Sequence, residues 1–128
     1  MILLDTNYLI RLLVAGSQEA HSIKAWVDAG EDLCTSVIPW YEFLCGPVDD
    51  RGIDIVRWVL QDRIVPFTIE QSQESSRLFN VCGRKRNLRV DAMIAAAAIV
   101  CNASLATANI DDFSPFVSQG LRLIEPIT

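Results

Sequence analysis

The chain has 128 residues, of which 51% are hydrophobic and 21% charged, and its formal net charge is −5. This apolar content excludes a disordered chain, and the length fits one domain spanning residues 1–128. No run of 18 apolar residues occurs, and the first residues lack the basic leader of a signal peptide, so we expect no membrane span and a cytoplasmic protein.

Short apolar runs alternate with helical patterns along the first half of the chain. Residues 2–4 indicate a buried strand that ends at Asp5, and Thr6 and Asn7 offer the start of a helix that stops at 16–17. The next predicted elements are a helix over 17–29, a strand over 33–37, a helix from Pro39 to about 46, and a helix over 53–60.

The second half continues the same alternation. Residues 64–67 indicate a strand, 70–85 a helix, and 92–101 an alanine-rich helix that Asp91 opens. The last two predicted strands cover 104–107 and 121–124, with a loop over 109–116. The pattern predicts an α/β fold, a three-layer α/β/α sandwich around a central, mainly parallel sheet of five strands.

The cysteines do not form a metal motif. They are scattered without a CxxC pair, and His21 is the only histidine. A zinc site is therefore not expected. We expect free, buried thiols at Cys34, Cys45, Cys82 and Cys101.

Several acids are candidate functional residues, although each also has an ordinary structural explanation. Asp5 and Asp91 each precede a helix and are suited to cap it. The exposed stripe of a helix would explain Glu42, and turn chemistry would explain Asp111 or Asp112. The combination is harder to explain, because ligands of parallel sheets bind beyond the carboxyl ends of the strands, where two of these acids lie.

Clustered carboxylates point to a divalent cation. They repel one another and are driven toward protonation unless a cation joins them. Oxygen ligands without cysteine or histidine suit Mg²⁺, with Mn²⁺ as a substitute. Such an ion polarises a phosphoryl oxygen and activates a water, so the acids predict hydrolysis of a phosphodiester.

Four stretches carry a resemblance to a known family. They are Leu-Leu-Asp-Thr-Asn at 3–7, Trp-Tyr-Glu-Phe-Leu-Cys-Gly at 40–46, Val-Asp-Ala-Met-Ile-Ala-Ala-Ala-Ala at 90–98 and Leu-Ala-Thr-Ala-Asn-Ile-Asp-Asp-Phe at 105–113. In this order and spacing the sequence resembles the PIN-domain nucleases, and within them the VapC-type toxins of bacterial and archaeal toxin–antitoxin pairs. The resemblance covers nearly the whole chain.

The resemblance implies roles for individual residues. It makes Asp5, Glu42 and Asp91 the core acidic triad and Asp112 the fourth acid, with Asp111 the weaker match. It also implies polar residues beside the metal and lining the same pocket, namely Thr6, Asn7, Thr107 and Asn109. Ala108 is a departure, since relatives often carry a basic residue there, and we expect it to affect substrate contact.

The resemblance further implies an activity and partners. We expect a Mg²⁺-dependent endoribonuclease that is the toxin of a type II pair, acts on RNA, forms a homodimer and is blocked by a cognate antitoxin. The alternative is a non-catalytic PIN-like domain that binds RNA or regulates. A phosphatase of the haloacid-dehalogenase class is disfavoured, because it needs a second aspartate where Asn7 stands, and a response-regulator receiver domain wants paired acids that precede its phosphorylated aspartate.

A basic segment is the candidate RNA contact. Four cations fall within six positions before Asp91, at Arg84, Lys85, Arg86 and Arg89. They could hold RNA phosphates at the rim of the pocket, or simply complete a helix end favoured by its dipole. Bound metal would offset the local negative charge, so the acidic net charge does not exclude a nucleic-acid substrate.

Overall fold

A parallel sheet of four strands lies at the centre of the molecule, in the order β3-β2-β1-β4. The structure is a computed structural model that describes residues 1–128. Its strands are β1 (Ile2–Leu4), β2 (Leu33–Ser36), β3 (Ile64–Val65) and β4 (Ser104–Ala106). Every neighbouring pair is parallel, and β1 pairs with β4 from Ile2 opposite Ser104 to Leu4 opposite Ala106. The pairing of β1 with β4 therefore brings the start of the chain next to residues from its last fifth.

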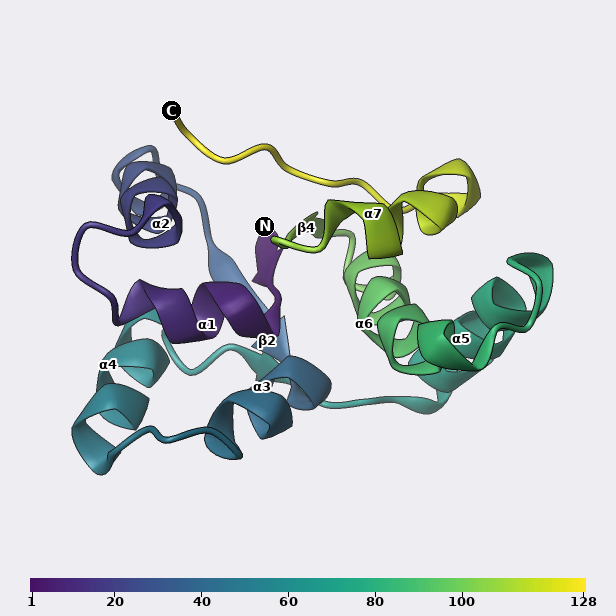
Figure 1. Cartoon of the computed structure of the whole chain (residues 1–128), viewed down its shortest axis with the longest axis horizontal. Coiled ribbons are helices and arrows are strands. Elements are labelled where there is room, and N and C mark those ends of the chain that lie inside the picture. The colour runs from purple at the N-terminus through teal and green to yellow at the C-terminus, as the bar shows by residue number, and fades with distance from the viewer.

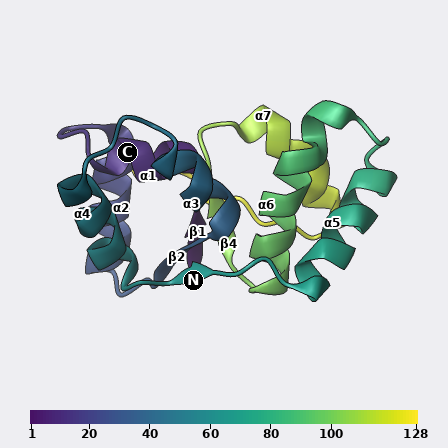
Figure 2. The same ribbon diagram turned by 90° about the horizontal axis from the view of Figure 1, so that it is seen from below.

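Helices cover the sheet on both sides. They are α1 (Thr6–Leu12), α2 (Gln18–Asp28), α3 (Val37–Leu44), α4 (Asp50–Leu60), α5 (Ile69–Val81), α6 (Arg89–Val100) and α7 (Ile110–Phe113), with 3-10 turns at Arg86–Leu88 and Ser114–Gln119. Figures 1 and 2 show α1, α2 and α4 on one side of the sheet and α5, α6 and α7 on the other, with α3 between the two groups. This arrangement confirms the three-layer α/β/α fold with its parallel sheet.

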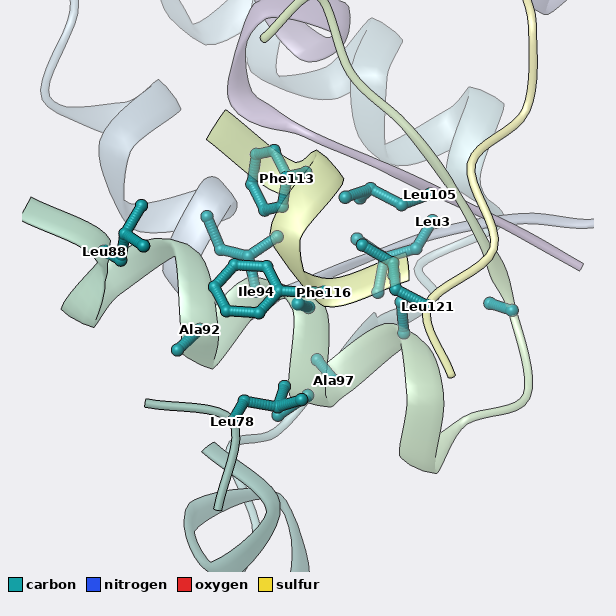
Figure 3. Close-up of a cluster of buried hydrophobic side chains, with 14 of the residues drawn as sticks. Leu3, Leu78, Leu88, Ala92, Ile94, Ala97, Leu105, Phe113, Phe116 and Leu121 are labelled. Atoms are coloured by element: carbon teal, nitrogen blue, oxygen red, sulfur yellow. The ribbon is translucent and has the colours of Figure 1, made fainter. Parts of the chain in front are cut away.

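Alternate strand residues supply two separate cores. Leu3 and Cys34 pack with the buried alanines of α6 and with Phe113 and Phe116, which lie in and just after α7 (Figure 3). The neighbouring residues, among them Leu4, face the second core with α1, α2 and α4. Successive side chains of a strand point to opposite faces, so each β1 residue belongs to one layer only. The alanines of α6 allow the helix to pack closely against α5.

The sheet has four strands where the sequence pattern predicts five. Residues 121–124 form only a single parallel bridge, Leu123 opposite Leu105. The chain then leaves the sheet edge and runs back toward α2 (Figure 1), where the Ile127 N–H donates to the Ser22 hydroxyl at 2.9 Å. The predicted loop over 109–116 was also wrong, because α7 and a 3-10 turn occupy it.

Two further expectations need correction. Asp91 does not cap α6, since the helix begins two residues earlier and Leu88 takes the cap position without a side-chain hydrogen bond. The cysteines are all free, but only Cys34 is buried, and Cys45 is exposed. None of the helices combines the length and apolar character needed to cross a membrane.

Candidate metal centre

Asp5 is held rigidly where β1 ends and α1 begins. It is the N-cap of α1, and its Oδ1 accepts the Thr6 N–H at 2.8 Å. Its Oδ2 accepts the Thr107 hydroxyl at 2.7 Å. Only 4% of Asp5 is exposed, and this burial raises the pKa of its carboxyl, against which the hydrogen bonds from Thr107 and Thr6 act. Asp5 therefore has the capping role, at the carboxyl end of β1 where the sequence predicts the site.

Thr107 directs its proton to that carboxylate. It follows β4 directly, is buried, and its Oγ1 accepts the Asn109 N–H at 3.0 Å. A hydroxyl has one proton, and because a backbone donor occupies a lone pair, that proton is free for Asp5. The predicted residue Asn109 thus acts through its backbone, while its side chain is exposed.

Glu42 is tied to the same edge by Thr6. It is the sixth residue of α3, which follows β2 directly, and its Oε1 accepts the Thr6 hydroxyl at 3.3 Å. Partial burial raises the pKa of Glu42, the Thr6 hydrogen bond lowers it, and the charge of Asp5 adds to the rise. Thr6 therefore contacts both acids, through its backbone and its side chain. Asn7, half-buried in the first turn of α1, makes no side-chain hydrogen bond.

Asp91 shows that four acids share one region. It lies in the first turn of α6 and is half-buried. Its pKa is raised to about 6, first by burial and then by the charges of Asp112, Asp5 and Glu42. The repulsion among like charges reaches Asp91 from three different elements of the fold. Among these charges that of Asp112 acts most strongly on Asp91, which favours Asp112 as the fourth acid.

The acids lie near one another without converging on one point. No three histidine, cysteine, aspartate or glutamate side chains stand within common reach of a single metal ion. Mutual repulsion between carboxylates favours such separation. The donors are all oxygens, and the charge repulsion on Asp91 is the kind that a divalent cation relieves. The all-oxygen donor set is of the kind that a hard cation such as Mg²⁺ prefers, and Asp5, Asp91 and Asp112, with Glu42, are the residues that would hold it.

The predicted substrate residues divide into two groups. A hollow of about 310 Å³ follows β4 and is lined by residues 108–112, including Ala108 and Asn109. Arg84, Lys85 and Arg86 are exposed just before the end of α6 that carries Asp91. Arg89 turns elsewhere, because its guanidinium lies 5.5 Å from the ring centroid of Phe79 on α5.

The two aromatic residues that precede Glu42 lie in different environments. Trp40 packs against Phe43 with ring centroids 5.4 Å apart, whereas Tyr41 is 67% exposed. Sequence reasoning missed Ser36, whose buried hydroxyl at the end of β2 has no hydrogen-bond partner. The signal available for it was its place at a strand end next to the predicted site.

Comparison with known families settles the relationship. The sequence profile of the PIN domain matches residues 2–115. The chain belongs to the PIN domain family. The match spans β1 to α7 and so includes all four acids of this PIN domain. A search of curated proteins by sequence finds no match.

Solved structures with the same PIN fold include several toxin–antitoxin assemblies. A toxin–antitoxin complex from Klebsiella pneumoniae is 26% identical with a TM-score of 0.71, covering 89% of this chain and 91% of that one. VapBC2 from Rickettsia felis, bound to a promoter DNA fragment, is 19% identical with a TM-score of 0.71, covering 97% and 98%. FitAcB from Neisseria gonorrhoeae is 21% identical with a TM-score of 0.69, covering 98% of each chain.

Proposed function

We propose that this PIN domain is a Mg²⁺-dependent endoribonuclease and the toxin of a toxin–antitoxin pair. The observation that carries the proposal is the charge that Asp112, Asp5 and Glu42 exert on Asp91 at the carboxyl edge of the sheet. The raised pKa values of Asp5, Glu42 and Asp91 show that keeping these carboxylates charged in one place costs stability, and a bound cation would relieve that cost. Membership of the PIN family and the likeness to toxin–antitoxin complexes support the same function.

The four acids would have different roles in this hydrolysis. Bound Mg²⁺ supplies positive charge that stabilises negative oxygens developing at the phosphorus and lowers the pKa of a water. Asp5, fixed by its hydrogen bonds with Thr6 and Thr107, would be the most rigid of the ligands, and Asp91 and Asp112 would complete the oxygen set. Glu42, exposed and hydrogen-bonded to Thr6, is placed to orient a water. The hydrolysis leaves a 5′-phosphate and a 3′-hydroxyl.

The basic segment supports RNA as the substrate. Arg84, Lys85 and Arg86 carry no ion pair within the protein and therefore keep their charge available for phosphates. Arg89, placed over Phe79, does not belong to this group. A segment of three free cations beside an acidic pocket provides a positive rim around the scissile phosphate.

An RNA cleavage assay tests the proposed activity. Purified protein is incubated with total RNA in Mg²⁺, in Mn²⁺ and in EDTA, beside Asp5→Asn and the matched control Asp54→Asn, an exposed aspartate on α4. We expect cleavage that requires metal and Asp5 and that survives the control change. Cleavage by Asp5→Asn at the wild-type rate, or products ending in a cyclic 2′,3′-phosphate, would contradict the proposal.

The proposed partner is a cognate antitoxin, with a homodimer as the assembly. Support comes from the toxin–antitoxin complexes of the same fold and from a groove of about 680 Å³ between α2 and α4. Trp58, 74% exposed, lies at this groove with Val27. We expect the product of an adjacent gene to bind the chain and suppress cleavage, and Trp58→Glu to weaken that suppression while cleavage persists. Light scattering of the purified chain tests the dimer.

The alternative of a non-catalytic RNA-binding domain makes a different prediction. Such a domain would inhibit growth, if at all, by binding alone. Inhibition of growth that is unchanged in Asp5→Asn, together with no cleavage by folded wild-type protein freed of antitoxin, would favour it.

A further inference from the structure

Ser36 is an unusual buried serine. It is 0% exposed, and its Oγ is one of only two buried side-chain oxygen or nitrogen atoms without a hydrogen-bond partner, the other being Oε1 of Gln71. A buried hydroxyl without a partner is costly, and native proteins nearly always satisfy it. Such an atom suggests a partner that joins only in the working state of the site.

The residues that follow Ser36 explain why its hydroxyl has no capping hydrogen bond. Ser36 is the N-cap of α3, a position where serine ordinarily accepts a hydrogen bond from the N–H of the second or third helical residue. The third residue of α3 is Pro39, which has no N–H. No side-chain capping bond forms, so the hydroxyl of Ser36 remains available for another group.

The sheet register places Ser36 beside Asp5. Leu3 pairs with Cys34 in the parallel ladder of β1 and β2, and counting two residues onward brings Asp5 opposite Ser36. Both residues are extended, with ψ of 167° and 168°, so the alternation of strand side chains still applies. Leu3 and Cys34 both pack in the core formed with α6. Asp5 and Ser36 therefore face the same side of the sheet, toward the helix that carries Asp91.

The acids differ in their need for a donor. Both oxygens of Asp5 already accept hydrogen bonds, from Thr6 and from Thr107. Asp91 is surrounded by the charges of Asp112, Asp5 and Glu42, and no hydrogen bond to its carboxylate offsets them. The hydroxyl of Ser36, which has no partner and faces the same side of the sheet, is able to donate the hydrogen bond that the Asp91 carboxylate lacks.

We propose that Ser36 is a positioning residue of the metal centre, whose hydroxyl donates a hydrogen bond to the ligand carboxylates, and to Asp91 foremost, when they hold a divalent cation. This inference rests on the proposed function, since it deepens the same site. Groups that hydrogen-bond to metal ligands orient them, and their loss typically weakens metal binding by 10- to 100-fold.

Calorimetric titration with Mn²⁺ tests the role without relying on activity. We expect Ser36→Ala to bind Mn²⁺ about tenfold more weakly than wild type, and Ser36→Cys, which keeps the volume but donates poorly, to resemble it. In EDTA the Tm of Ser36→Ala should equal or exceed that of wild type, because the change removes an unsatisfied buried hydroxyl. A purely structural serine would lower the Tm and leave the Mn²⁺ affinity unchanged.

Ser22→Ala is the matched control. Ser22 is also 0% exposed, but it lies on α2 and its hydroxyl accepts the Ile127 N–H. We expect this change to lower the Tm and to leave Mn²⁺ binding as in wild type. Mn²⁺ affinities of Ser36→Ala and wild type within twofold of each other would overturn the inference about Ser36 alone.

The wild-type results separate this inference from the proposed function. Wild-type protein that binds no Mn²⁺ would overturn both. Wild-type protein that binds Mn²⁺ but cleaves no RNA would overturn the endoribonuclease, and the affinity of Ser36→Ala would still decide the role of Ser36.

Discussion

The hydroxyl of Thr107 donates a 2.7 Å hydrogen bond to Oδ2 of Asp5, although 102 positions separate the two residues along the chain. The parallel pairing of β1 with β4 makes this contact possible, because it aligns the carboxyl ends of the two strands. The contact fixes a buried carboxylate that would otherwise be able to rotate. The geometry of the candidate centre thus depends on a neutral side chain as well as on its acids.

Thr107→Val should destabilise the protein by about 1.5–3 kcal/mol, since it leaves a buried carboxylate without one of its donors. Urea unfolding at neutral pH in EDTA measures the loss, and Thr107→Ser should recover most of it by restoring the hydroxyl. A valine variant as stable as wild type would show that solvent satisfies Asp5 in place of Thr107.

Asp91→Asn should stabilise the protein in EDTA near neutral pH. The folded-state pKa of Asp91, about 6, exceeds the value of about 4 for an unfolded chain, so the folded state binds this proton more tightly. The contribution of Asp91 to stability therefore falls as pH rises from about 4 to about 6 and stays low above that. After a discount for solvent screening the gain is on the order of 1–2 kcal/mol.

Thermal unfolding of wild type and Asp91→Asn across this pH range provides the check. The difference in Tm should be small near pH 4 and grow to on the order of 5 °C near pH 7. A difference that does not change with pH would contradict the raised pKa of Asp91, because any difference between the folded and unfolded pKa makes stability depend on pH.

Mg²⁺ should stabilise the wild-type protein, and the effect should depend on pH. At a concentration a hundredfold above the dissociation constant, the free energy of unfolding rises by about 2.7 kcal/mol. Below about pH 6 the gain should shrink, because Asp91 takes up a proton and metal binding requires the ionised carboxylate. The Tm in Mg²⁺ minus the Tm in EDTA, measured from about pH 5 to about pH 8, reports the effect. Asp5→Asn should abolish it.

The two adjacent aspartates of α7 should behave differently. Asp112 acts on Asp91, so Asp112→Asn should lower the pKa of Asp91, as seen by NMR titration, and reduce RNA cleavage by at least roughly 100-fold. Asp111→Asn is its matched control and should leave the pKa of Asp91 and most of the activity intact. The reverse result would assign the fourth acid to Asp111.

The free cations should contribute to RNA affinity through phosphate contacts. Replacing Arg84, Lys85 and Arg86 by alanine, each in the Asp5→Asn background, should weaken binding of single-stranded RNA and lower the slope of affinity against salt by roughly one per cation. Fluorescence anisotropy at several salt concentrations measures both quantities. Arg89→Ala should change the slope least, because this side chain lies over Phe79. Equal effects at all four positions would mean that the whole segment contacts RNA.

The sequence was sufficient to predict the layers of the fold. Alternation of short apolar strands with helices predicts the parallel sheet, and Asp5 at the end of β1 follows from that pattern directly. The prediction of a fifth strand was wrong. Residues 121–124 have the composition of a strand, but the chain turns away toward Ser22 after a single bridge, which limits their pairing with β4. Such a path is set by tertiary contacts that local pattern does not contain.

Side-chain partners were the less predictable part of the site. Asp91 resembled a cap because it precedes apolar residues, but the 3-10 turn at Arg86–Leu88 starts the helix earlier and places Asp91 inside its first turn. Arg89 resembled its basic neighbours, yet its position on α6 directs it to the aromatic ring of Phe79. The sequence offered one signal for Ser36, its place at the end of a predicted strand, but its relation to Asp5 depends on the register of β1 against β2.

The position of β4 also has a consequence for synthesis of the chain on the ribosome. Asp5, Glu42 and Asp91 are all translated before residues 104–112, which supply the strand that anchors Asp5 and the last acid. Domains are made at about 5–20 residues per second from the N-terminus, so an emerging chain remains unassembled at this centre for several seconds. The candidate centre therefore cannot assemble until nearly the whole chain has been translated, because the strand that anchors Asp5 comes last.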